Sequence, residues 1–218
     1  MKIRQFLIIG AGRFGSAVAT SLYDLGHEVV VADRDELAID VIMDRVTHAV
    51  VLDATDEEAL AQLGLNTFDE VIVAIGTNLE ASILTIVAAK SRGAAHVISK
   101  ATTETTARVM LKVGADEVVR PEHDMGVRLA KNLATPSIVD AFNLGDHYEV
   151  IEFRARDKLC GRLQDLKLSN RFGVQVIAVS RQGKLEVSPS ADYVIKPGDN
   201  VVLIGEVKDV RKLRNYLE

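Results

Sequence analysis

The sequence of 218 residues carries a formal net charge of −5, with 48% hydrophobic and 26% charged residues. These values are ordinary for a globular protein and argue against a nucleic-acid backbone or an anionic membrane as the main ligand. The single cysteine, Cys160, excludes an internal disulfide and a C-x-x-C zinc site. No apolar run reaches the ~20 residues that span a bilayer. The sequence passes from Met1–Lys2 directly into a strand-like run, so we expect no signal peptide. The cysteine usage favours a reducing, cytoplasmic setting.

Residues 1–135 alternate short β-branched runs with helix-length segments. Several of these runs are apolar almost throughout, as in parallel strands that are buried on both faces. Gly26, Gly93 and Gly114 stand where helices should end. The predicted strands are Phe6–Ile9, Glu28–Ala32, Ala49–Leu52, Glu70–Ile75, His96–Ser99 and Glu117–Val119. This alternation predicts an α/β fold with a Rossmann-type, doubly wound parallel sheet.

The helix expected after the fourth strand has several large apolar residues at helical spacing. Leu79, Ile83, Ile86 and Val87 recur on one helical face, so we expect that face to pack on the sheet.

The pattern changes after residue 135, where Pro136 interrupts a helix and Gly145–Asp146 indicates a turn. We predict a nucleotide-binding domain over 1–135 and a crossover linker over 136–147 that includes the partly apolar segment Ile138–Leu144. A small α+β domain of roughly 70 residues follows over 148–218, near the lower size limit for an independent core. Its predicted elements are the strands "YEVIEFRAR", "VQVIAVSR", "KLEVS" and "NVVLIGE", a helix over Leu163–Asn170, and a final helix with Val207, Val210, Leu213 and Leu217.

A glycine loop of the form G-x-G-x-x-G follows the first predicted strand and opens a helix. Gly10 permits a tight turn, Gly12 permits close approach of phosphate, and Gly15 lets the helix pack on the strand. Asp33 follows about 20 residues later, where an acid accepts hydrogen bonds from a ribose. Arg34 would suit a 2′-phosphate, but Asp33 would repel it, so we expect a free ribose 2′-hydroxyl.

Arg13 departs from the ordinary dinucleotide loop, in which backbone N–H groups and the helix dipole already serve the phosphates. An added guanidinium can clamp further phosphate charge, and Phe14 lies beside it in the same loop. The alternative is that Arg13 points to solvent or pairs with a surface acid.

Further candidates lie at the predicted carboxyl ends of other strands, where open α/β sheets hold ligands. Lys100 could meet terminal phosphates, and Glu122 could help to hold a cation that bridges them. Each is also an ordinary solvated charge or helix-start acid, and Thr55 is also a candidate N-cap for "DEEA". The remaining candidates are Asp53, Ala54 and Thr55 after the third strand, and Ala74, Ile75 and Gly76 after the fourth.

The stretches "IIGAGRFGSAVATSL", "DATDEEAL", "VIVAIG", "GADEVVRPEHDMG" and "SPSADYVIKPGDNVVLIG" together resemble the RCK or KTN regulatory subunits of Trk/Ktr potassium uptake systems. The resemblance covers the whole chain, as a TrkA-N domain followed by a TrkA-C (RCK-C) domain. It implies a non-enzymatic, cytoplasmic gating subunit beneath a KtrB- or TrkH-like membrane subunit that translocates potassium. It also implies homodimers that assemble into an octameric ring whose shape depends on ATP or ADP, with NAD or NADH as the alternative ligand.

Carried over onto matching positions, the resemblance assigns roles to the candidates above. Arg13 would contact the terminal phosphate of ATP, Asp33 the ribose, and the segment from Asp53 to Thr55 would lie near the adenine. Lys100 would approach phosphate across a dimer interface, and Glu122 would lie near a divalent cation. Some relatives bind cyclic di-AMP in the small domain, but "LKLSNRFG" differs from their sequence in that region, so this ligand is not assigned.

Two other functional classes fit the sequence less well. An NAD-dependent oxidoreductase needs a proton-transfer group beside the nicotinamide, and no acid partner is visible in the sequence for His48, His96, His123 or His147. A redox sensor that binds DNA needs a basic recognition helix, and neither the acidic balance nor the pattern of elements predicts one.

Overall fold

The computed structural model describes residues 2–76, 78–134, 138–145 and 147–217. The chain divides into two compact units, Met1–Asp124 (unit 1) and Met125–Glu218 (unit 2). The division falls within helix α6 (Pro121–Ala134). The domain limit predicted at 135 stays a prediction, since residues 135–137 lie outside the described residues.

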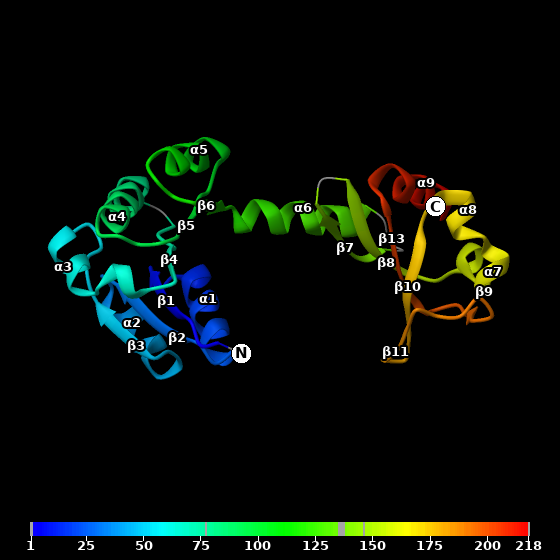
Figure 1. Cartoon of the computed structure of the whole chain (residues 1–218), viewed down its shortest axis with the longest axis horizontal. Coiled ribbons are helices and arrows are strands. Elements are labelled where there is room, and N and C mark those ends of the chain that lie inside the picture. Colours follow the sequence, from blue (N-terminus) through cyan, green and yellow to red (C-terminus); the bar gives the residue numbers. More distant parts are fainter. Residues whose placement is uncertain (1, 77, 135–137, 146, 218) are drawn as a thin grey trace. The chain divides into compact units, whose positions relative to one another are not determined.

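Unit 1 is built around a parallel six-stranded sheet with the order β3-β2-β1-β4-β5-β6, which confirms the doubly wound fold (Figure 1). The strands are β1 (Gln5–Ile9), β2 (Glu28–Asp33), β3 (His48–Val51), β4 (Glu70–Val73), β5 (Val97–Lys100) and β6 (Glu117–Val119). The connecting helices are α1 (Arg13–Asp24), α2 (Glu36–Ile42), α3 (Glu57–Gln62), α4 (Leu79–Ser91) and α5 (Glu104–Lys112), with short 3₁₀ turns at Met43–Arg45 and Leu65–Thr67.

The central strand β1 is apolar because both of its faces are buried. Leu7 and Ile9 belong to a core with residues of α4 and α5, whereas Phe6 and Ile8 belong to a second core with residues of α1 and α2. Successive side chains of a strand point to opposite faces, so a strand between two helical layers needs an unbroken apolar run.

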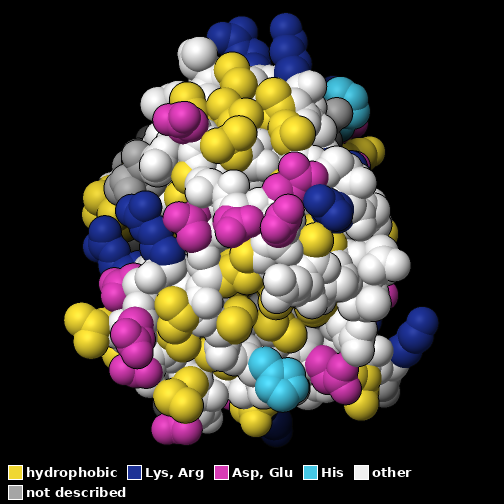
Figure 2. Space-filling view, turned by 90° about the vertical axis from the view of Figure 1, so that its left-hand side faces the viewer, with side chains coloured by type: hydrophobic (Ala, Val, Ile, Leu, Met, Phe, Trp, Pro, Cys, Tyr) yellow, Lys and Arg dark blue, Asp and Glu magenta, His cyan; other side chains and the backbone are white. Residues whose placement is uncertain are grey.

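The predicted buried face of helix α4 is wrong. Leu79 and Val87 are 41% and 47% exposed, and only Ile86 of the four residues predicted to face the sheet is fully buried. The buried face consists mostly of small residues, among them Ala81, Ser82, Thr85, Ala88 and Ala89. Exposed hydrophobic side chains are also found elsewhere on the surface. Figure 2, which faces the left-hand side of Figure 1, shows them among acidic side chains. Small residues allow the helix to approach the sheet closely, and this leaves the larger side chains outside.

Unit 2 contains an antiparallel five-stranded sheet with the order β11-β10-β13-β8-β7 and a two-stranded sheet of β12 and β9. Its strands are β7 (Ile138–Leu144), β8 (Tyr148–Arg154), β9 (Gly161–Arg162), β10 (Gln175–Arg181), β11 (Lys184–Val187), β12 (Val194–Ile195) and β13 (Asn200–Glu206). Its helices are α7 (Leu163–Leu166), α8 (Leu168–Phe172) and α9 (Val207–Leu217), with a 3₁₀ turn at Asp157–Leu159.

Two predictions for this region differ from the structure. The linker predicted over 136–147 is wrong for residues 138–144, because these form β7 and pair with β8, whose backbone groups they satisfy. The single helix predicted over Leu163–Asn170 is divided into α7 and α8 by Lys167, which has a left-handed φ of 49°.

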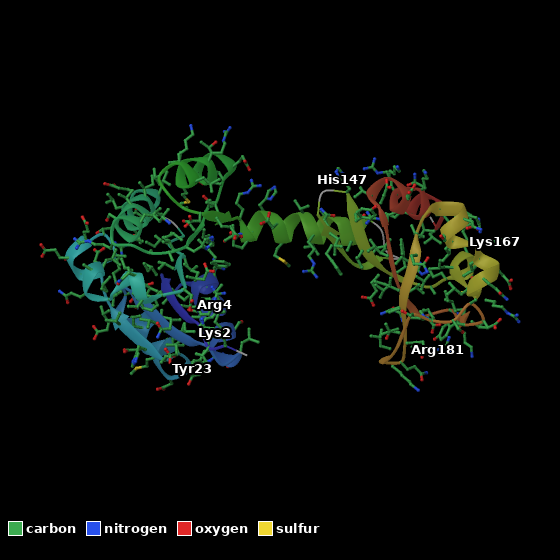
Figure 3. The ribbon with its side chains drawn as sticks, in the orientation of Figure 1. Lys2, Arg4, Tyr23, His147, Lys167 and Arg181 are labelled. Carbon is green, nitrogen blue, oxygen red and sulfur yellow. The ribbon has the colours of Figure 1, made fainter. Side chains whose placement is uncertain are left out.

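Two charge pairs hold the elements of unit 2 together. Arg181, at the end of β10 (Figure 3), donates to both carboxylate oxygens of the buried Asp199 at 2.8 and 2.7 Å. Arg214 of α9 donates to Glu149 of β8 at 2.8 Å. Val210 and Leu213 of α9 are fully buried, as the amphipathic pattern of that helix predicts.

Candidate functional site

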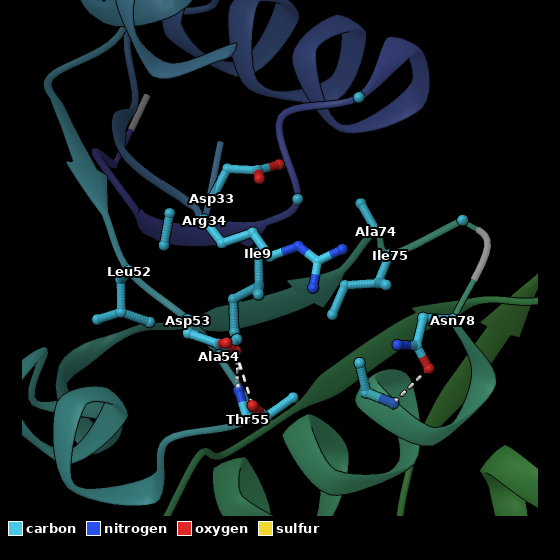
Figure 4. A pocket seen from close by; sticks show the side chains of 15 residues that line it. Ile9, Asp33, Arg34, Leu52, Asp53, Ala54, Thr55, Ala74, Ile75 and Asn78 are labelled. Atoms are coloured by element: carbon cyan, nitrogen blue, oxygen red, sulfur yellow. Dashed lines mark hydrogen bonds between the residues drawn. The ribbon is translucent and has the colours of Figure 1, made fainter. Parts of the chain in front are cut away.

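A pocket of about 210 Å³ opens at the carboxyl ends of the strands in unit 1 (Figure 4). It lies where β1 is flanked by β2 on one side and β4 on the other. This is the point at which the strand order reverses, where doubly wound folds bind ligands. The pocket is lined by Ile9, Gly10, Gly12, Ala32, Asp33, Arg34, Leu52, Asp53, Ala54, Thr55, Ala74, Ile75, Gly76, Asn78 and Ala81.

The three glycines of the loop have three different surroundings. Gly10 has a φ of +109°, and a Cβ added to it would lie 3.0 Å from the carbonyl carbon of Ala74. A Cβ on Gly15 would lie only 1.9 Å from the carbonyl oxygen of Gly10. Gly12 has open space, with nothing within 4 Å of an added Cβ. Gly10 and Gly15 are therefore required by the fold, whereas the space at Gly12 is free for a ligand.

Asp33 fixes the glycine loop to the end of β2. Its Oδ2 accepts a hydrogen bond from the backbone N–H of Ala11 at 2.6 Å, and its Oδ1 accepts one from that of Asp35 at 2.9 Å. Each carboxylate oxygen can accept a second hydrogen bond. Asp33 can therefore hold the loop and still receive a ribose hydroxyl from the pocket.

Helix α1 begins at the pocket without a side-chain cap. Asp35, Asp56, Asn78 and Thr103 cap α2, α3, α4 and α5 through their side chains. The N-cap of α1 is Gly12, and in the described part of the chain no side chain caps this helix and no acid lies in its first turn. The backbone N–H groups of the first turn of a helix have no partner within the helix, so this end of α1 is suited to an anion.

The loop after β3 is ordered by local hydrogen bonds. The backbone N–H and the hydroxyl of Thr55 donate to Asp53 Oδ1 at 2.9 and 2.7 Å, and these bonds hold the pKa of Asp53 below its ordinary value. The buried Thr85 of α4 donates to the carbonyl oxygen of Ala54 at 3.1 Å. The N-cap of α3 is Asp56, so the alternative role of Thr55 as the N-cap is wrong.

Arg13, Phe14, Lys100 and Glu122 do not line the pocket, but Lys100 lies beside it. The ammonium Nζ of Lys100 lies 5.8 Å from the centroid of the Phe14 ring, and a Cβ on Gly76 would lie 3.7 Å from the same atom. Lys100 also donates to Glu122 Oε1 at 2.6 Å. This bond, with the charge of Arg13 as a smaller contribution, holds the pKa of Glu122 below its ordinary value. Arg13 is exposed and opens α1.

The described residues do not form a divalent-cation site by themselves. No group of three or more His, Cys, Asp or Glu side chains is placed to hold a metal ion among them. Glu122 lies against an ammonium group instead. One carboxylate paired with a lysine does not fit a divalent cation without further oxygen ligands, so the role of Glu122 at a metal stays a prediction.

Some pocket residues were absent from the predicted site. Leu52, Asn78 and Ala81 line the pocket, and Asn78 also accepts a hydrogen bond from the backbone N–H of Ala81 as the N-cap of α4. The sequence signal for Asn78 was its position directly before a helix, which is a common position for asparagine.

The histidine prediction also needs correction. His96 Nδ1 lies 2.5 Å from Glu70 Oε2, and His123 Nδ1 lies 3.1 Å from Asp124 Oδ1, so both have acid partners. Among the described residues that line the pocket there is no histidine.

The chain matches the family model of the TrkA-N domain over residues 6–121 and that of the TrkA-C domain over residues 152–218. It is 35% identical over 216 residues to the Ktr system potassium uptake protein A of Bacillus subtilis (strain 168), covering 99% of this chain and 97% of that protein. No helix of the described residues is long and apolar enough to span a membrane.

The solved structures that share the fold include two forms of the GsuK channel. One is the GsuK channel bound to NAD, with a TM-score of 0.70 and 16% identity, and the match covers 100% of this chain and 40% of the channel chain. The other is GsuK bound to ADP, with a TM-score of 0.54 and 18% identity, covering 62% of this chain and 36% of that one. The chain thus spans less than half the length of these channel proteins.

Proposed function

Because this chain belongs to the TrkA-N/TrkA-C family of regulatory subunits of Ktr potassium uptake systems, we propose that it is a cytoplasmic subunit that gates potassium flux in response to a bound adenine nucleotide. The observation that carries this proposal is the uncapped start of α1 at Gly12, directly beside the pocket that Asp33 lines. A helix start without its own cap, next to an acid suited to ribose, fits a nucleotide better than a substrate of another class.

The nucleoside and the phosphates of the nucleotide would bind at two adjoining places. Its volume of about 210 Å³ is below the roughly 300–1,000 Å³ of typical small-ligand pockets, so we expect it to hold the nucleoside. Asp33 would accept hydrogen bonds from the ribose, and the base would lie between Arg34 and the loop from Asp53 to Thr55. The phosphates would pass over Gly12 to the first turn of α1.

Arg13 gives this site its sensitivity to the number of phosphates. It follows Gly12 directly and is exposed at the start of α1, where a guanidinium can reach charge beyond a pyrophosphate. A ligand shifts a conformational equilibrium only by binding one state better than the other. A third phosphate held by Arg13 in one state only would supply that difference between ATP and ADP.

The ligand of GsuK in its solved structures is NAD in one case and ADP in another, which supports an adenine nucleotide and leaves NAD or NADH as the alternative. We favour ATP and ADP because of Arg13. A hydride-transferring oxidoreductase stays the less favoured alternative, and hydride transfer to any substrate of a panel would establish it. We propose no role for a divalent cation in this response to the nucleotide.

Gating requires a potassium-translocating membrane partner. We propose that this chain acts on a KtrB- or TrkH-like subunit, as a homodimer that assembles into an octameric ring.

Deletion of the gene for this chain is expected to lower potassium uptake severalfold at low external potassium, because the membrane subunit loses its regulator. The measurement is uptake of rubidium as a potassium tracer by the deletion strain carrying either the wild-type gene or the Gly12→Ala variant. We expect the wild type to restore uptake. The variant, in which a methyl group occupies the space for phosphate, should not. Unchanged uptake after deletion would contradict a role in potassium transport.

A further inference from the structure

Lys100 and Glu122 differ strongly in how much they are exposed. The Lys100 side chain, at the end of β5, is 11% exposed, whereas that of Glu122, in the first turn of α6, is 68% exposed. Their 2.6 Å hydrogen bond therefore joins a largely enclosed cation to a carboxylate that can turn into water.

The surroundings of Lys100 indicate that its ammonium lies at the phosphate side of the pocket. Gly76, which lines the pocket, has no side chain to separate it from Lys100 Nζ, since a Cβ there would lie 3.7 Å from that atom. Phe14, in the first turn of α1, lies on another side of the ammonium. A phosphate at the uncapped start of α1 would therefore come close to Lys100.

We propose that Glu122 occupies Lys100 in the nucleotide-free chain and that a phosphate group of the nucleotide displaces it, so that binding is an exchange of one anion for another on the same ammonium. This inference rests on the proposed function, because it needs a nucleotide in the pocket. It adds a residue that opposes binding, whereas the other site residues favour it.

Physical chemistry favours the exchange in one direction. A terminal phosphate carries more negative charge than a carboxylate, and both accept charge-assisted hydrogen bonds from an ammonium. The released Glu122 regains its hydration at low cost because most of its side chain already faces solvent. Lys100 keeps an anionic partner throughout, which a largely enclosed ammonium requires.

The exchange also involves α6. Glu122 lies in the first turn of that helix, and the chain passes from unit 1 to unit 2 between Asp124 and Met125 of the same helix. Displacement of Glu122 by phosphate would therefore change an interaction at the start of the helix that leads into unit 2.

The chain offers a matched control for this inference. Glu104 Oε2 lies 2.6 Å from Arg120 Nη1, and its side chain is 64% exposed. Glu104 lies in the first turn of α5, as Glu122 does in α6. Glu104→Gln therefore removes the same charge from an ion pair of the same length, without touching Lys100.

The test is titration calorimetry of the full-length wild type, E122Q and E104Q with ADP and with ATP, in buffer containing EDTA so that no divalent cation contributes. We expect E122Q to bind both nucleotides about 1.5- to fivefold more tightly than the wild type, the range of an exposed ion pair, and E104Q to bind like the wild type. Equal or weaker binding by E122Q, or an equal gain in E104Q, would overturn the exchange. Failure of the wild type to bind any nucleotide would instead contradict the proposed function.

Discussion

Replacing Gly15 by alanine is expected to destabilise unit 1 by about 3 kcal/mol, the upper end of the cost of overpacking. The added Cβ would lie 1.9 Å from the carbonyl oxygen of Gly10. That atom belongs to the backbone and cannot rotate away, so α1 must move off the loop that it packs against. Urea unfolding of the full chain, followed by circular dichroism, measures the loss.

Gly12→Ala is the matched variant, because nothing lies within 4 Å of a Cβ at Gly12. It should unfold at the same urea concentration as the wild type and yet lose nucleotide binding, since the methyl group would occupy the space for phosphate. If Gly15→Ala proved as stable as the wild type, the close packing of α1 on the loop would be wrong. If Gly12→Ala bound nucleotide normally, the phosphates would not pass over this glycine.

Replacing Arg214 by methionine is expected to destabilise unit 2 by about 3–5 kcal/mol, the cost of leaving one member of a buried ion pair alone. The side chain of Glu149 is 6% exposed and accepts from Arg214 at 2.8 Å. Without the guanidinium, this carboxylate would stay in the interior between α9 and the sheet with no cation to compensate it. Scanning calorimetry of the full chain measures the shift of the corresponding transition.

The double variant Glu149→Met with Arg214→Met separates the charge effect from the packing effect. Replacing both members of a buried pair by apolar residues is often neutral or stabilising, and Arg214 Nε already has no hydrogen-bond partner among the described residues. The double variant should therefore recover most of the loss. A double variant as unstable as Arg214→Met alone would show that packing of the arginine stem, and not the unpaired carboxylate, accounts for the effect.

The fold of unit 1 was predictable because its signals are local. An apolar run such as β1 indicates a strand buried on both faces, and a glycine loop between a strand and a helix is typical of a doubly wound sheet. The face of α4 was predicted wrongly because this helix has apolar residues on several faces, so spacing alone could not select Ile86 over Leu79 and Val87. Strand β7 depends on pairing with β8, a tertiary contact that composition does not reveal.

In the candidate site, too, local features were predictable from the sequence, whereas contacts between distant residues were not. Asp33, Gly12 and the loop from Asp53 to Thr55 were predicted from their positions at strand ends, and the structure brings them into one pocket. Lys100 and Glu122 were each predicted as candidates, but their ion pair joins residues 22 apart in sequence and could not be read from either one. The acid partner of His96 was missed for the same reason, since Glu70 is 26 residues away.

The measurement that most directly tests the account is the binding of ATP and ADP to the wild type and to Arg13→Ala by titration calorimetry. Loss of charge-assisted hydrogen bonds to a terminal phosphate costs about 1.5–3 kcal/mol, so affinity for ATP should fall about 10- to 100-fold. Affinity for ADP should change little, because its phosphates are held by the backbone at the start of α1. Equal losses for the two nucleotides would contradict the claim that Arg13 distinguishes ATP from ADP. Tighter binding of NADH than of ATP by the wild type would contradict ATP and ADP as the ligands.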